Sequence, residues 1–88
     1  MPYIKKDQRQ GIDALLEPLL EHIKGQEVED IDGQINYIVS RLLKEVYPPR
    51  YFNYNRAMGV LESIKQEFYR RYVAPYEEGK IKENGDLK

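Results

Sequence analysis

The sequence predicts an all-α fold, a compact bundle of three main helices with a single domain over residues 1–88. Apolar residues recur at steps of three and four in three successive segments, which places them on one face of an α-helix. A chain of 88 residues has room for one hydrophobic core, and we therefore expect one domain. Glycines and prolines separate the three segments, as breaks between helices require.

The first helix is predicted at residues 12–24, where six apolar residues share one stripe. They are Ile12, Leu15, Leu16, Leu19, Leu20 and Ile23. Pro18 lies off this stripe and removes a backbone donor, so we expect a kink or two short pieces that meet near Glu17. Gly25 is the expected C-terminal stop, and an acidic connection over residues 26–30 follows it.

The second helix is predicted at residues 31–46 by the same periodicity. Its apolar residues are Ile31, Ile35, Ile38, Val39, Leu42 and Val46. Asp30 precedes them and is the expected N-cap, since its carboxylate can accept a bond from a free backbone amide. Pro48 and Pro49 end the helix because each disfavours helical geometry in the residue before it.

The third helix is predicted at residues 54–73, with Asn53 or Asn55 as its cap and Pro75 beyond its end. Its apolar stripe includes Phe68 and Tyr72, which we expect in the core. Gly59 lies near its first turns, where the close approach of a ligand or another backbone explains a glycine. A short helical turn over residues 76–83 and a short pairing of residues 2–4 with 86–87 complete the expected fold.

Composition argues against several function classes. The 14 basic and 15 acidic residues nearly cancel, which disfavours general nucleic-acid binding. The chain has no cysteine, no signal-peptide pattern and no run of 18 apolar residues. We therefore expect a cytoplasmic protein that does not contact the membrane.

Catalytic and metal-binding groups are scarce. His22 is the single histidine, and it falls on the charged flank of the first predicted helix, where a solvated surface role is expected. Without cysteine, nucleophile and base pairs of the Cys-His kind are absent. We expect no enzyme activity, no cofactor and no metal site.

Tyrosine and arginine are concentrated in the second half of the chain. The predicted ligand-binding residues are Arg50, Tyr51, Tyr54, Arg56, Tyr69, Arg70, Arg71 and Tyr76. Arginine offers a planar fork for phosphate or carboxylate, and tyrosine offers a flat ring for stacking and a hydroxyl for orientation. The same residue types are enriched at protein interfaces, and part of the set is also consistent with packing or with a solvated basic face.

Several motifs together resemble a family of small uncharacterised proteins of bacteriophages, prophages and bacteria. They are the opening residues 1–10, Ile35-Asn36-Tyr37, Asn53-Tyr54-Asn55, residues 59–62, residues 68–71, Pro75-Tyr76-Glu77 and residues 83–86. The resemblance spans nearly the whole chain and implies a phage-associated protein in the host cytoplasm, with no assigned activity.

Two functional hypotheses follow. The first is a homo-oligomeric binding protein whose Tyr/Arg surface holds a small anionic, nucleotide-like ligand. By analogy with small helical phage proteins that sequester immune signals, it would act against host defence. The alternative is a protein-interaction module, a homo-oligomer or an inhibitor of a host protein, with no small-molecule ligand.

Overall fold

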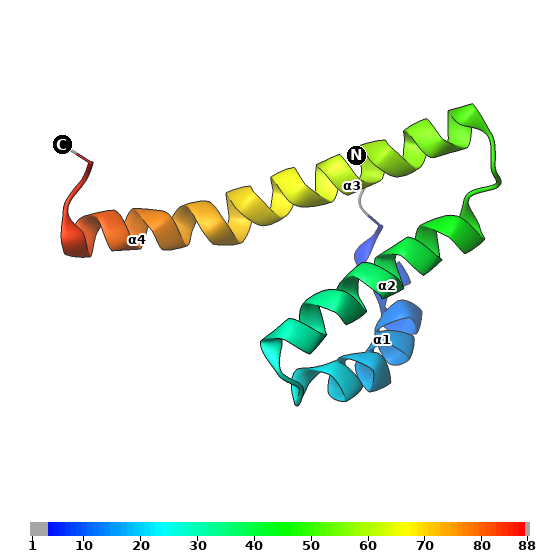
Figure 1. Cartoon of the computed structure of the whole chain (residues 1–88), viewed down its shortest axis with the longest axis horizontal. Coiled ribbons are helices and arrows are strands. Elements are labelled where there is room, and N and C mark those ends of the chain that lie inside the picture. The colour runs from blue at the N-terminus through cyan, green and yellow to red at the C-terminus, as the bar shows by residue number, and fades with distance from the viewer. Residues whose placement is uncertain (1–3, 88) are drawn as a thin grey trace. The chain divides into compact units, whose positions relative to one another are not determined.

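The computed structural model describes residues 4–87, which are helical for most of their length and contain no strand (Figure 1). This confirms the predicted all-α fold with three main helices. The chain divides into two units, Met1–Pro49 and Arg50–Lys88, which are described separately below. The predicted bundle packing and the single domain therefore stay predictions.

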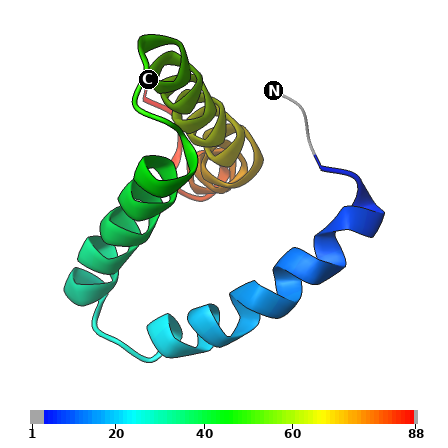
Figure 2. The same ribbon diagram turned by 90° about the vertical axis from the view of Figure 1, so that its right-hand side faces the viewer.

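Unit 1 is a hairpin of two helices. A short 3-10 helix, η1 (Lys6–Gln8), leads directly into α1 (Arg9–Lys24), and α2 (Val28–Val46) follows after a tight turn. Figure 2 shows α1 and α2 as the legs of an open V that spread from this turn. The hairpin therefore has a closed end, where side chains of the two helices meet, and an open end, where they do not.

The closed end of the hairpin holds the packed part of unit 1. Ile23 is only 7% exposed, and the Gln26 side chain donates a hydrogen bond of 2.8 Å to the carbonyl oxygen of His22. The Gln34 amide of α2 donates in turn to the side-chain oxygen of Gln26. Gly25 caps α1, as predicted.

Helix α1 differs from the prediction at two points. It begins at Arg9, three residues before the predicted start, and it continues unbroken through Pro18. Of the two expected alternatives, the division into two pieces near Glu17 is therefore wrong, and the kink stays a prediction. One missing hydrogen bond does not end the helix here, because the apolar stripe that carries Ile23 continues on both sides of the proline.

Helix α2 also begins three residues early, so the prediction that Asp30 is its N-cap is wrong. The N-cap is Glu27, which has extended backbone, and Glu29 and Asp30 lie in the first turn. Carboxylates in a first turn are stabilised by the positive end of the helix dipole. Asp30 therefore acts within the helix, and the connection between α1 and α2 is shorter than the predicted 26–30.

Unit 2 is one continuous helical rod. It comprises α3 (Tyr51–Phe68), a π-helical turn η2 (Tyr69–Val73) and α4 (Ala74–Asn84) (Figure 1). The helix begins at Tyr51, directly after an extended Arg50, so the predicted start at 54 and the Asn53 or Asn55 cap are wrong. The predicted C-terminal helical turn over residues 76–83 is confirmed as α4, which is three residues longer, but no break separates it from the helix before it at residue 73.

The π-helical turn explains why the rod passes through Pro75. Proline cannot donate a backbone hydrogen bond, and its ring crowds the carbonyl four residues earlier, here that of Arg71. The turn before it is wider, with the Ala74 amide donating to the carbonyl of Tyr69, five residues back. The wider turn makes room for the ring, and the helix continues to Asn84.

The C-terminal end of α4 agrees with the sequence. Gly85 follows Asn84 with φ of 89°, a conformation that favours glycine. The predicted pairing of residues 2–4 with 86–87 lies partly outside the described residues, and Ile4, Asp86 and Leu87 are in no strand. Between residues 4 and 87, no helix combines the length and apolar character needed to cross a bilayer.

We predict that Pro18→Ala stabilises the protein. Alanine restores the hydrogen bond that proline cannot donate inside α1, so the free energy of unfolding should rise by about 1–3 kcal/mol. Chemical denaturation followed by circular dichroism measures the change. Pro48→Ala, in the link between the two units, is the control and should give no such gain. An unchanged stability for Pro18→Ala would mean that α1 is already broken at Glu17.

Candidate functional site

All eight predicted ligand-binding residues lie in unit 2, but they form two separate groups. The first, called here the α3-start group, consists of Arg50, Tyr51, Tyr54 and Arg56. The second, the π-turn group, consists of Tyr69, Arg70, Arg71 and Tyr76. About 24 Å of helix separates Tyr54 from Arg70 at 1.5 Å per residue. Within one chain, the eight residues therefore do not surround one small ligand.

Three members of the α3-start group, Tyr51, Tyr54 and Arg56, lie in α3, and Arg50 is the N-cap before it. Only residues 47–50 form the link, and Tyr51 begins α3. Tyr51 and Tyr54 are 82% and 55% exposed. The Arg56 guanidinium lies over the ring of Phe52, 5.7 Å from its centre. This end of α3 therefore presents aromatic rings together with a cation that is stacked on one of them.

The guanidinium groups of the π-turn group are held by a carboxylate of the same helix. Glu67 pairs with Arg70, and its other oxygen lies 3.5 Å from Nη1 of Arg71. This pairing offsets part of the positive charge of the two arginines, which the sequence analysis expected to bind a phosphate group. Phe68 and Tyr72, which were expected in the core, contact one another with ring centres 5.1 Å apart and remain more than half exposed.

Two further contacts connect the π-turn group to α4. The negative charge of Glu77, and the hydrogen bond that its carboxylate accepts from the phenol, raise the pKa of Tyr69. The Lys80 ammonium lies 5.6 Å from the centre of the Tyr76 ring. The Tyr69 hydroxyl and the Tyr76 ring therefore both interact with side chains of α4. Tyr69 and Tyr76 are nevertheless 52% and 66% exposed.

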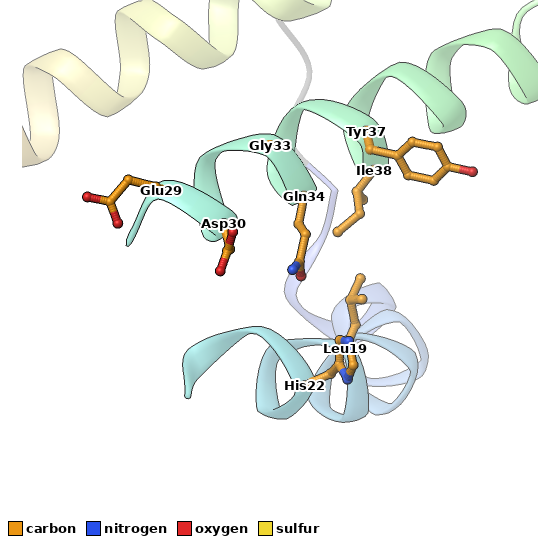
Figure 3. Close-up of a pocket in the computed structure, with 8 residues that line it drawn as sticks. All are labelled: Leu19, His22, Glu29, Asp30, Gly33, Gln34, Tyr37 and Ile38. Carbon is orange, nitrogen blue, oxygen red and sulfur yellow. The ribbon is translucent and has the colours of Figure 1, made fainter. Parts of the chain in front are cut away.

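Unit 1 contains a groove that the sequence did not predict. The groove, of about 560 Å³, lies between α1 and α2 near the closed end of the hairpin (Figure 3). It is lined by Leu19 and His22 of α1 and by Glu29, Asp30, Gly33, Gln34, Tyr37 and Ile38 of α2. Figure 3 shows Leu19 pointing towards α2, with Gln34 and Ile38 pointing towards α1. The groove therefore combines an apolar part with carboxylates at its acidic end.

Gly33 is a residue of the groove that the sequence analysis did not single out. A glycine inside a helix costs about 1 kcal/mol relative to alanine. A Cβ atom built at Gly33 would meet nothing within 4 Å, so no contact in the described chain requires a glycine there. The same is true of Gly59, for which a close contact was expected. Periodicity alone could not show that Gly33 and His22 border one space, because they lie on different helices.

Apolar side chains continue from the groove to the open end of the hairpin. A second hollow of about 320 Å³ follows α2, where Arg41 lies over the Tyr37 ring and pairs with Glu45. Large apolar side chains of both helices are exposed, and Leu42 and Val46 among them line this second hollow. This open-end apolar face consists of Ile12, Leu15, Leu16, Leu20, Leu42 and Val46, from 39% exposed at Leu20 to 78% at Leu15.

No metal site is evident in the part of the chain that the structure describes. No three or more His, Asp or Glu side chains between residues 4 and 87 are grouped so that they could hold an ion. The acidic residues of the groove, Glu29 and Asp30, are neighbours on the exposed first turn of α2. Their chemistry favours a cationic group of a partner over a bound metal ion.

Comparison with known proteins identifies a family and no function. The family model described as domain of unknown function DUF6899 matches residues 1–87. Neither a curated protein nor a solved structure matches the chain. The match confirms that the chain resembles an uncharacterised family, as its motifs predicted.

We predict that Glu77→Gln lowers the pKa of Tyr69. The carboxylate favours the protonated phenol, so removing its charge should make Tyr69 ionise at lower pH. Because the pKa is raised in the folded state, the stabilisation is present below the ordinary tyrosine pKa and is lost as pH rises through the raised value. Absorbance titration at alkaline pH, with Tyr69→Phe subtracted, measures the shift. Identical curves for the two proteins would contradict the contact.

Proposed function

The chain belongs to the DUF6899 family, whose function is unknown, and we propose that it is a non-catalytic protein-interaction module that associates with itself. The observation that carries this proposal is the open-end apolar face of unit 1. Leu15 at 78%, Val46 at 67% and Leu42 at 58% exposure are large apolar side chains on helices that have no further element of their own unit to cover them. Where such side chains form a contiguous exposed patch, the patch is typical of an interaction site.

The size of the hydrophobic effect supports association of this face. Burying a partly exposed leucine, isoleucine or valine side chain contributes about 1–2 kcal/mol of favourable free energy, so burying six of them contributes roughly 6–12 kcal/mol. Association costs on the order of 4–15 kcal/mol in lost freedom of motion. The apolar face thus drives association only together with other contacts, and the aromatic and arginine side chains of unit 2 are of the type that supplies them.

A non-catalytic role is consistent with the chemistry of the described residues. His22 lies at the groove without a thiol partner, because the chain contains no cysteine. Arg41 and Tyr69, whose pKa values are raised, lie in different units. Arg41 interacts with Tyr37 and Glu45 of α2, and Tyr69 interacts with Glu77 of α4. A cytoplasmic location and a phage origin belong to the same proposal; the first is an expectation from composition, and the second is what the family resemblance implies.

We predict that Leu15→Asp separates the assembly. The wild-type protein should form a multimer of the 10.5 kDa chain. Because the Leu15 side chain is 78% exposed, a carboxylate there should not unfold α1, but it should lower the affinity between subunits at least about 10-fold. Light scattering and sedimentation velocity give the mass, and circular dichroism gives the helix content. Leu87→Asp, at the exposed C-terminal end, is the matched control and should leave the mass unchanged. A wild-type monomer at about 100 µM would overturn the proposal.

A second candidate function is capture of a small anionic, nucleotide-like ligand that serves as a host immune signal. The exposed rings of Tyr69 and Tyr76, next to Arg70 and Arg71, favour it. The charge offset by Glu67 and the distance between the two Tyr/Arg groups weigh against it. A ligand of this kind would need arginines from more than one copy of the chain.

Thermal denaturation against a panel of cyclic and linear nucleotides tests this candidate. If it is correct, one nucleotide should raise the midpoint by several degrees, because a ligand that binds only the folded state stabilises it. Arg71→Ala should abolish the shift and leave the multimer mass unchanged. Lys82→Ala, a cation in the last turn of α4, is the control and should retain the shift. If no nucleotide of the panel shifts the thermal midpoint, the ligand-capture function is excluded and the protein-interaction function is the remaining candidate of the two.

A further inference from the structure

The groove of unit 1 has a form that fits an arginine-bearing helix. Its volume of about 560 Å³ lies within the usual range of binding pockets. Its apolar part is formed by Leu19 and Ile38, and its acidic end by the first turn of α2. Figure 3 shows Asp30 on the same side of α2 as Gln34, facing the space above α1. A side chain with an apolar stem and a cationic head therefore matches both parts.

Gly33 affects the shape of the groove, although all the glycines of the chain have equally open surroundings. It lies inside α2, where glycine is one of the poorest helix formers, and it lines the groove. Nothing in the described chain lies within 4 Å of the position that its Cβ would take. Because glycine has no side chain, nothing projects from α2 at this position, and another helix can approach the backbone of α2 closely.

The charges of the two units are complementary. Residues 17–32, which form the closed end of the hairpin, contain six acidic residues and one lysine. Residues 50–61, which begin unit 2, contain Arg50 and Arg56 and no acidic residue. Opposite charges of this kind attract two protein surfaces and fix their register. The start of α3 is therefore a segment of this chain whose charge complements that of the groove.

The side chains of the α3 start also have the character of an interface anchor. Tyr51, Phe52 and Met58 are between 64% and 82% exposed. Arg56 lies stacked over Phe52, which holds the guanidinium near the aromatic surface. Tyrosine and arginine are the residues that most often dominate binding energy at protein interfaces.

From these observations we infer that the groove between α1 and α2 binds the first two turns of α3, residues 51–58, of a second copy of the chain. Arg56 of the second copy then lies against Asp30, and its aromatic neighbours contact Leu19 and Ile38, the apolar part of the groove. Each copy has one groove and one α3 start, and we place the two reciprocal contacts around a two-fold axis, the commonest symmetry of soluble homo-oligomers. This inference rests on the proposed self-association, and it completes a three-helix packing with two helices from one copy and one from the other.

Filling the groove tests the site. Gly33→Gln places a polar side chain with good helix propensity over the groove, whereas Gly79→Gln makes the same change in α4, where the space is also open. Both variants should gain helix content in circular dichroism. Only Gly33→Gln should weaken the dimer, by at least about 10-fold in sedimentation velocity. Equal dimer affinity for the two variants would overturn the inference.

Charge exchange identifies the occupant. Asp30→Lys and Arg56→Glu should each weaken the dimer, because like charges then face each other at both contacts. A mixture of the two variants should restore it, since each lysine groove then meets a glutamate helix and each aspartate groove meets an arginine helix. Native mass spectrometry with one variant isotopically labelled measures the mixed dimer.

The outcomes separate this inference from the proposed function. A wild-type dimer that Leu15→Asp separates, but that Asp30→Lys and Arg56→Glu leave intact, would overturn the groove contact and keep the proposed function. Single variants that dissociate and do not recover on mixing would show that α3 of a second copy is not the occupant. A wild-type monomer at about 100 µM would overturn both.

Discussion

The central physical constraint on this protein is that its helices carry more apolar surface than each unit can cover. Two helices in an open V meet only near the turn, and Ile23 is the one buried residue among the described part of unit 1. In unit 2, a single rod has no other helix of its own unit to pack on, and only Ala57 is buried there. Because most helix stability in proteins comes from packing of an apolar face, these helices require further contacts.

Because of this constraint, the aromatic and arginine residues of unit 2 fit a protein-interaction surface better than the small-ligand site that composition suggested. Placed along one rod, they cannot enclose a nucleotide within a single chain, and Glu67 already offsets the charge of Arg70 and Arg71. Arranged as an exposed helix with stacked cations, they suit the surface of another protein. The unit 1 groove, with Gly33 in its wall and carboxylates at its end, has the complementary character.

Proline and glycine residues in this chain do more than end helices: they also change the shape of the helix surfaces. Pro75 is accommodated by the π-helical turn, which changes the direction in which Tyr69 and the following side chains leave the rod. Gly33 lowers the surface of α2 at the groove, and Gly85 ends α4 with a backbone conformation that other residues avoid. Each therefore affects which side chains are available to a partner.

The sequence by itself determined the helical fold, because the three- and four-residue spacing of apolar side chains is a local property of the chain. It also identified Gly25 and Gly85 as helix ends and the Tyr/Arg residues as a concentrated set. Only the structure decided that Tyr51 and Tyr76 belong to the same rod as the other members of the set, since that depends on the helix beginning at Tyr51 and continuing through Pro75. The groove likewise required the structure, because His22 and Gly33 become neighbours of one space only when α1 and α2 fold back on each other.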